Sequence, residues 1–139
     1  MFQNEQIYQL IPQRPPIVMV DALWSATESG AGTGLTIDES NIFVQNGVMR
    51  EAGLIEHIAQ SAAAYAGYST FSQGLPPKLG FIGEIKSCKI HTLPAVGSQL
   101  RTEIKLMAEA AGVTLIAAET HVADTLVAEC QMKIFIKED

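Results

Sequence analysis

The stretch "GVMREAGLIEHIAQSAAAYAGY" (Gly47–Tyr68) decides the fold of this chain, because from Arg50 onward it predicts one long apolar helix. Small residues recur on its neighbouring turns and would let the helix lie close to a sheet: Ala59, Ala62, Ala63, Ala66 and Gly67. A helix as apolar as this is expected to be buried. It nevertheless carries Glu56, His57 and Gln60, and burying a carboxylate is costly. These three polar side chains are therefore the first candidates for a site.

The remainder of the chain predicts a short helical turn before the prolines at 15 and 16, and then strands. In "LRTEIKL" (Leu100–Leu106) charged residues alternate with apolar residues or threonine, a period of two that marks a strand with one solvent-exposed face. Glu28–Gly34 is expected to form a turn. Six segments are strand candidates: Ile17–Ala26, Leu35–Ser40, Lys78–His91, Leu100–Leu106, Gly112–Ala123 and Thr125–Lys137.

One long helix and about six mostly antiparallel strands predict an α+β fold in which the sheet wraps around a central helix. A chain of 139 residues is long enough for a single core, so we expect one domain, residues 1–139. The net charge of −6 leaves no basic patch for phosphates, which argues against nucleic acid as a partner. No apolar run is long enough and free enough of charge to span a membrane.

The N-terminus and the cysteines predict a cytoplasmic protein without metal. "MFQNEQIYQL" (Met1–Leu10) lacks the basic and apolar segments of a signal peptide. Cys88 and Cys130 lie far apart in the sequence and show no paired spacing of the kind that binds zinc. We expect two small buried thiols, and neither a metal nor another cofactor.

Three stretches resemble the 3-hydroxyacyl-(acyl carrier protein) dehydratases of fatty-acid synthesis, which have the hotdog fold. "LIPQRPPIVMVD" (Leu10–Asp21) is similar to the family's opening L-P-H-R-x-P-x-L-L-V-D. "LIEHIAQSAAA" (Leu54–Ala64) is similar to L-I-x-E-x-x-A-Q-x-x-A, the front of the family's central helix. "FIGEIKSCKIHTLPAVGSQL" (Phe81–Leu100) is similar to F-x-G-I-x-x-x-x-F-x-x-x-V-x-P-G-D-x-L. Order and spacing agree over most of the chain, so the resemblance implies a hotdog fold.

The resemblance also implies a site for dehydration. In the family, a histidine on the loop before the helix removes the proton α to the thioester, and a helical carboxylate assists loss of the 3-hydroxyl as water. Backbone N–H groups at the helix start polarise the thioester carbonyl. Glu56 falls on the family's carboxylate and is the predicted catalytic residue. Gln60, one turn later on the same face, and Gly83, the glycine of the third stretch, are predicted to bind substrate.

The loop histidine is missing from this chain. The corresponding region, "FVQNGVMREAG" (Phe43–Gly53), is about three residues shorter than the family's G-H-F-P-x-x-P-x-x-P-G and contains no histidine. The family's glycine ahead of the helix falls near Glu51, which makes Glu51 a candidate at the substrate carbonyl. Asn46 or Gln45 is a candidate for positioning a water or hydroxyl, although an amide is no base. Gln13 replaces a different histidine of the opening motif, which is not the family's catalytic one.

None of the three histidines of the chain is an evident substitute. His57 follows Glu56 directly, so a helix points the two side chains about 100° apart. We expect His57 to meet another strand or a partner subunit. His91 and His121 are expected to be structural or surface residues.

The resemblance implies a dimer, because the family places its acyl tunnels at a dimer interface. In pathways to aryl-polyene and flexirubin-type pigments, similar proteins without the loop histidine accompany a histidine-bearing relative and act as its structural partner. The first hypothesis is therefore a dehydratase-like protein that binds acyl thioesters on acyl carrier protein and has weak or no activity alone, as a homodimer or a heterodimer. The alternatives are a non-catalytic partner of an active hotdog dehydratase and an acyl thioesterase that uses Glu56 to activate water. Whether the chain turns over substrate stays open at this point.

Overall fold

The computed structural model describes residues 1–76 and 80–136 of the chain. Its centre is the 22-residue helix α1 (Glu51–Ser72). The other elements, in chain order, are β1 (Phe2–Gln3), the 3-10 helix η1 (Asn4–Gln9), β2 (Ala22–Ala26), β3 (Gly30–Thr36), β4 (Val44–Gln45), β5 (Val48–Met49), β6 (Gly80–Ile90), β7 (Gln99–Ala110), β8 (Val113–Val122) and β9 (Thr125–Ile136).

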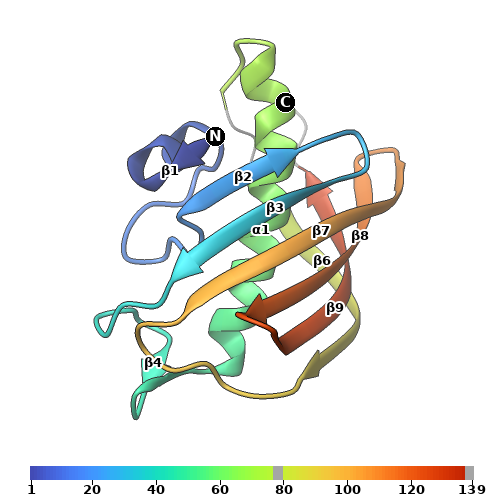
Figure 1. Ribbon diagram of the computed structural model, residues 1–139. Helices are drawn as coiled ribbons and strands as arrows, with labels where there is room; N and C mark the ends of the chain where they lie inside the picture. Colours follow the sequence, from blue (N-terminus) through green and yellow to red (C-terminus); the bar gives the residue numbers. More distant parts are fainter. Residues whose placement is uncertain (77–79, 137–139) are drawn as a thin grey trace.

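Seven strands form one curved antiparallel sheet in the order β1-β2-β3-β7-β8-β9-β6, which wraps around α1 (Figure 1). This arrangement confirms the predicted α+β fold with one long helix against an antiparallel sheet. The described sheet has seven strands where about six were expected, because Phe2–Gln3 pairs with β2. Strand β6 stands at the end of the order, next to β9.

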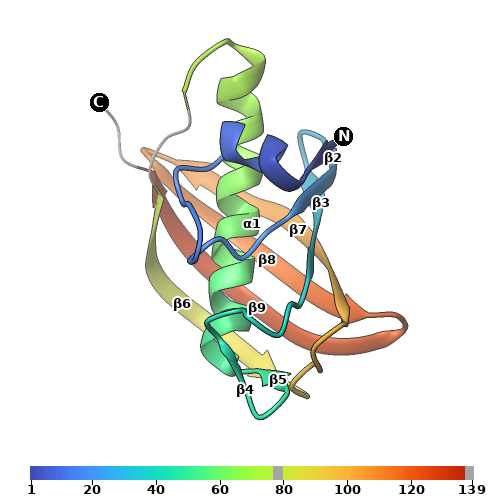
Figure 2. The same cartoon turned by 90° about the vertical axis from the view of Figure 1, so that its left-hand side faces the viewer.

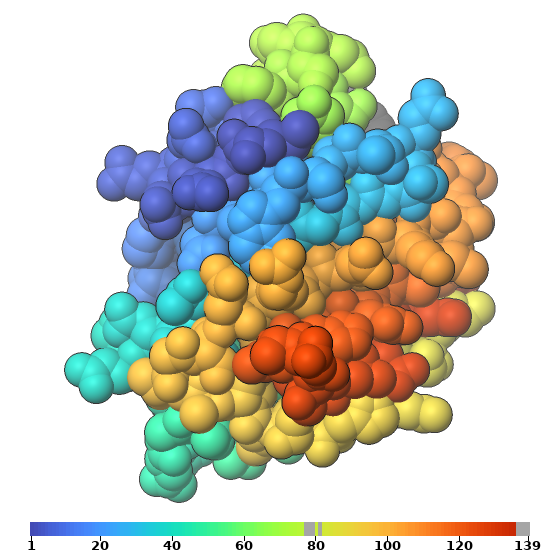
Figure 3. All heavy atoms as spheres, viewed as in Figure 1, coloured from blue at the N-terminus to red at the C-terminus, as the bar shows by residue number. Residues whose placement is uncertain are grey.

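The chain covers α1 on more than one side. The N-terminal segment passes over a face of the helix that the sheet leaves open (Figure 2). There the chain runs so close that a Cβ at Gly67 would overlap the carbonyl oxygen of Leu10. The small residue at this position therefore accommodates the N-terminal segment and not, as expected, the sheet. From the sheet side, the C-terminal end of α1 emerges beyond the strands (Figure 3). Within the described ranges, no helix is long and apolar enough to cross a membrane.

Several predicted strands differ from the structure at their ends. The segment Ile17–Ala26 is strand only from Ala22, because its first residues hydrogen-bond to a side chain of α1 rather than to a neighbouring strand. The segment Leu35–Ser40 leaves the sheet after Thr36. Residues 78, 79 and 137, at the ends of two other predicted strands, lie outside the described ranges.

The turn expected at Glu28–Gly34 was largely wrong, because most of it belongs to β3, which pairs with both β2 and β7. Its glycines are explained by close packing. A Cβ at Gly30 would overlap the carbonyl oxygen of Ile104, and a Cβ at Gly34 would overlap the ring of Trp24. Glycine-rich strands of this kind look like turns in a sequence, because glycine is common in both.

A short hairpin, β4–β5, stands directly before α1. Its two-residue turn is Asn46 and Gly47, with left-handed φ angles of 56° and 80°, which these two residue types adopt readily. The hairpin and the residue before it pack on the first turn of the helix: a Cβ at Gly53 would lie only 2.9 Å from the Cγ of Met49 and 2.6 Å from the Cβ of Phe43. The shortened region that lacks the histidine is thus a packed hairpin.

Candidate functional site

A cavity of about 220 Å³ lies between α1, the edge strand β6 and the N-terminal segment. Glu56 and Gln60 enter it from the helix, one turn apart, as the sequence predicts. Its other walls are apolar or small except for one glutamine; the lining residues are Gln13, Glu56, Ala59, Gln60, Ala63, Gly80, Ile82 and Ile134. The cavity therefore combines one carboxylate with two amides in an otherwise apolar setting.

Gln60 fixes both the cavity wall and the carboxylate. Its Oε1 accepts a hydrogen bond from the backbone N–H of Met19 at 2.6 Å. Its Nε2 donates to the carbonyl of Ile17 at 2.9 Å and to Glu56 Oε2 at 2.8 Å. Because these three bonds use both N–H donors of the amide and one acceptor position of its oxygen, Gln60 holds the N-terminal segment on α1 and at the same time orients the half-buried side chain of Glu56. A substrate-binding role for Gln60 itself stays a prediction.

His57 points away from Glu56 into the core, as helical geometry predicts, and meets strand β7. It is fully buried; Nδ1 lies 2.6 Å from the carbonyl oxygen of Met19 and Nε2 lies 2.8 Å from Thr102 Oγ1. Since a carbonyl only accepts, Nδ1 donates to Met19 and Nε2 accepts from Thr102, which in turn bonds to Thr120 at 2.7 Å. Burial lowers the pKa of His57 to about 4, so its ring is neutral at physiological pH.

Three predicted substrate-binding residues do not line the Glu56 cavity. Glu51 is the exposed first residue of α1, with Oε1 3.5 Å from Nε of Arg50. Asn46 is exposed at the tip of the β4–β5 hairpin. Gly83 lies on β6, where a Cβ would be 2.5 Å from the ring of Phe135. A binding role for these three residues stays a prediction.

Gln13 belongs to the cavity, although the predicted site did not include it. Its Oε1 is buried, and among the described residues it has no hydrogen-bond partner. A buried acceptor without a partner is unfavourable and rare in folded proteins, so a hydrogen-bond donor on a bound molecule is a natural partner for it. The signal in the sequence was the replacement of a histidine in the opening motif.

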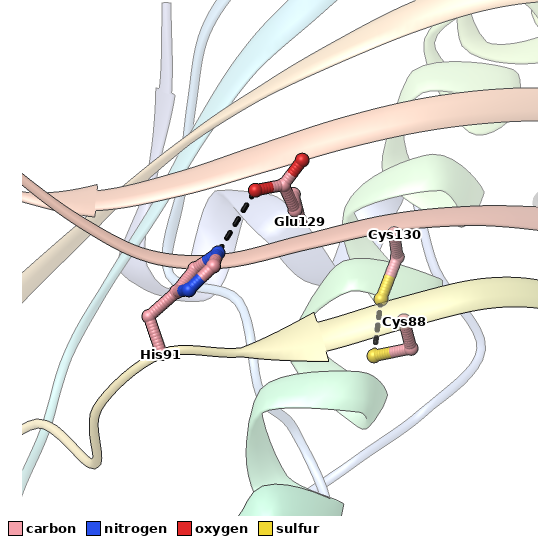
Figure 4. A network of polar contacts seen from close by, with 4 residues as sticks. All are labelled: Cys88, His91, Glu129 and Cys130. Atoms are coloured by element: carbon pink, nitrogen blue, oxygen red, sulfur yellow. Dashed lines mark hydrogen bonds and ion pairs between the residues drawn. The ribbon is translucent and has the colours of Figure 1, made fainter.

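The other two histidines also lie away from the cavity. His91 follows β6 and places Nε2 2.8 Å from Oε2 of Glu129, with both side chains exposed (Figure 4). His121 lies on β8 opposite Arg101 of β7, and both residues border a shallow depression that Trp24 of β2 also lines. All three histidines belong to the described ranges, so within them the Glu56 cavity contains no imidazole.

A larger cavity, of about 650 Å³, lies along the C-terminal half of α1. Ile134 borders both cavities. The larger one is lined by apolar side chains and, among its polar residues, Tyr65, Glu28 and Glu109, without a carboxylate held by an amide as Glu56 is. Size alone would favour it, but the chemical groups favour the smaller cavity as the candidate site.

The sequence profile of the ApeP-like family, described as ApeP dehydratase, matches residues 5–139. The chain belongs to the ApeP-like dehydratase family. It is also 30% identical over 112 residues to a 3-hydroxyacyl-[acyl-carrier-protein] dehydratase FabZ from Exiguobacterium sibiricum, across 76% of this chain and 78% of that protein. A FabZ from Bacillus cytotoxicus is likewise 30% identical over 112 residues, across 76% of each chain.

The ApeP-like fold is the hotdog fold, as the sequence predicts. The structure matches a chain of the dehydratase heterocomplex ApeI:P from Xenorhabdus doucetiae with a TM-score of 0.88, across 96% of this chain and 91% of that one. The two sequences are 14% identical, so this likeness establishes the fold.

Proposed function

We propose that this ApeP-like chain is one half of a dehydratase for 3-hydroxyacyl thioesters carried by acyl carrier protein. A second hotdog chain that bears a histidine completes the site. The observation that carries the proposal is the Glu56 cavity, in which Gln60 holds the carboxylate at 2.8 Å and no histidine of the described chain is present. A dehydratase needs both a base and an acid. The carboxyl group of Glu56 can serve as the acid, and no histidine of the described chain is present in the cavity to serve as the base.

In this arrangement the two chains divide the chemistry. The histidine of the partner takes the proton α to the thioester, and the electrons of that C–H bond form the new double bond. The protonated carboxyl group of Glu56 donates its proton to the 3-hydroxyl, which leaves as water while Glu56 becomes a carboxylate; the proton taken by the histidine later restores the acid. The Oε1 of Gln13 accepts a hydrogen bond from the same hydroxyl group before it leaves, which would satisfy its buried acceptor. The chain alone has weak or no activity, because it lacks the base.

The exposed edge of strand β6 is the place where we expect the partner chain to bind. Ile82 and Ile85 pair with Ile134 and Met132 of β9, which are buried, yet they are themselves 38% and 42% exposed. An apolar edge strand left open favours pairing with another strand. Because β6 also borders the Glu56 cavity, a hotdog chain that extends the sheet here would bring its own residues beside Glu56. The heterocomplex nature of the similar ApeI:P structure supports this view.

We infer the substrate and the pathway from the FabZ relatives. The related FabZ proteins are 3-hydroxyacyl-[acyl-carrier-protein] dehydratases, which supports a carrier-protein thioester as the substrate in fatty-acid or polyene-type synthesis. Lys86 and Lys89 are exposed on β6, the strand whose first residues line the cavity, and would offer an acidic carrier protein a basic contact. Such a pathway places the protein in the cytoplasm.

The experiment compares this chain, a histidine-bearing hotdog dehydratase, and their mixture on a 3-hydroxyacyl carrier-protein thioester. Enoyl product and free thiol are followed together. We expect the mixture to form enoyl product faster than the sum of its parts. Glu56→Gln should lower that rate by about 100-fold or more, since this is the usual contribution of a positioned acid. The matched control is Glu119→Gln, an exposed carboxylate on β8, which should leave the rate unchanged.

Each other result excludes part of the proposal. If the mixture is no faster than the sum of its parts, this chain does not complete a dehydratase. If it is faster but insensitive to Glu56→Gln, the chain is a purely structural partner. Release of free thiol that depends on Glu56 would identify a thioesterase instead.

A further inference from the structure

Cys88 and Cys130 are brought together by the fold, although 42 positions separate them in the sequence. They stand directly opposite each other on β6 and β9, and their Sγ atoms lie 2.6 Å apart. Figure 4 shows the two side chains pointing toward one another between the strands. Cys130 is buried in the core and Cys88 is half-buried beside it. The sequence predicted two separate buried thiols and offered no sign of this pairing.

The strand that carries Cys88 is an edge strand of the sheet. β6 is bonded to β9 on one side, and its register with β9 shifts twice, between Ile82 and Glu84 and between Ile85 and Ser87. Such irregularities disrupt the ladder locally. From Ser87 to Ile90 the pairing is regular, and the cysteine pair lies in this regular part. A covalent link there would fix the register of this regular part and tie the edge strand to β9.

We propose that Cys88 and Cys130 are a reversible disulfide site that fastens the edge strand β6 to β9. The site is separate from the Glu56 cavity and does not depend on the proposed activity. Its reactant is a low-molecular-weight disulfide such as oxidised glutathione. Disulfides in the cytoplasm are usually transient or redox-sensing, which fits a link that forms and opens with the thiol pool.

The reaction proceeds in two exchange steps. The thiolate of Cys88, the more exposed of the two, attacks one sulfur of oxidised glutathione, whose S–S bond breaks and releases one glutathione thiolate. Burial raises the pKa of the Cys130 thiol, so Cys88 is the better placed first nucleophile. Cys130 then gives up its proton and attacks the Sγ of Cys88, which releases the second glutathione. The two protein thiols are oxidised, and the glutathione disulfide is reduced to two thiols.

The link has a consequence for the surface beside the candidate site. Ile82 on the same strand lines the Glu56 cavity, and β6 is one of the two edge strands of the described sheet. Fastening β6 at Cys88 restricts the opening of that strand, so its backbone amides should exchange hydrogen more slowly. Helix α1 is held by its own contacts and should show no comparable change.

The test uses the purified full chain incubated with oxidised glutathione and then quenched with acid. We expect the intact mass to fall by two hydrogen atoms per chain, and peptide mapping to locate the link between Cys88 and Cys130. Excess reduced glutathione should restore both thiols. The oxidised chain should melt about 5–10 °C higher, as a link closing a long loop does, with slower hydrogen exchange confined to β6 and β9.

Two single-cysteine variants separate the steps. Cys130→Ala should retain one glutathione on Cys88, because nothing resolves the mixed disulfide. Cys88→Ser leaves the buried Cys130 alone, and we expect neither an adduct nor a rise in melting temperature. The proposal is overturned if the wild-type chain keeps both thiols, accumulates the glutathione adduct, or links two chains. It is equally overturned if the internal link forms but the melting temperature does not rise.

Discussion

Glu56 and His57 are neighbours in the sequence but belong to two different parts of the molecule. Glu56 is half-buried at a cavity next to an open sheet edge, and an amide holds one of its oxygens. His57 is fully buried, and both of its ring nitrogens are used inside the protein. One residue of helical rotation, about 100°, thus separates a carboxyl group that lines a cavity from a ring that is bonded inside the core.

The two sides are connected through the backbone of Met19. Its N–H donates to Gln60, which holds Glu56, and its carbonyl accepts from His57. Two side chains of α1 therefore bind the N-terminal segment: Gln60 on the face toward the cavity and His57 on the face toward the core. If this division holds, substitutions at His57 should cost stability, whereas substitutions at Glu56 should cost activity.

The largest expected effect on stability comes from His57→Ala. The change removes a buried ring and leaves the carbonyl of Met19 and the hydroxyl of Thr102 without their partner. We expect the free energy of unfolding to fall by about 3–4 kcal/mol, measured by urea denaturation. Glu56→Ala is the matched control on the same turn and should cost under about 1 kcal/mol, because the residue is half-exposed. Equal losses for the two variants would contradict the division.

The next effect is a dependence of stability on pH that belongs to His57. Its pKa is about 4 in the folded chain and 6.5 in the unfolded one, so the unfolded state binds the proton first as the pH falls. Stability is therefore complete above about pH 6.5 and declines as the pH falls toward 4. The loss amounts to about 3 kcal/mol at 1.36 kcal/mol per pKa unit.

The measurement is the urea midpoint at several pH values between 7 and 4 for the wild-type chain and for His57→Gln. The variant has a neutral amide in place of the ring, so it should lack this part of the decline. Carboxylates also titrate in this range, but they contribute to both proteins alike. Parallel curves would show that His57 is not the buried neutral group described here.

The sequence predicted the face of α1 that carries Glu56 better than the surroundings of His57. Helical periodicity alone placed Glu56 and Gln60 on one face and turned His57 away, because three residues on one helix need no knowledge of the rest of the chain. The partners of His57 come from Met19 and Thr102, which the fold brings together across 38 and 45 positions. No local pattern encodes such a meeting.

The same reason explains the other errors and omissions. The glycines of β3 looked like a turn because the Trp24 ring that requires Gly34 lies on another strand. Cys88 and Cys130 looked unrelated because their pairing depends on the register of β6 against β9. The family resemblance predicted the fold correctly. Glu51, Asn46 and Gly83 were also predicted to bind substrate; they lie outside the cavity, and their role stays a prediction. Gln13, which lines the cavity, was given no role in the predicted site.

The smallest expected effect tests that omitted residue. Gln13 presents a buried Oε1 that has no partner among the described residues, an arrangement that costs stability in the absence of a ligand. Gln13→Leu removes the acceptor and keeps a similar volume, so the free chain should gain about 1 kcal/mol in urea denaturation. In the mixture with a histidine-bearing partner, the same variant should raise the KM for a 3-hydroxyacyl thioester.

A gain in stability together with a loss in substrate binding is characteristic of a polar group kept for a ligand. Gln13→Asn is the control, since it keeps an amide on a shorter side chain and should recover part of the binding. If Gln13→Leu destabilises the free chain, the Oε1 has a partner within the protein. The case for a ligand site in this cavity would then depend on Glu56 and not on Gln13. The two faces of α1 would still differ, but by one carboxyl group and not by a pair of ligand-binding groups.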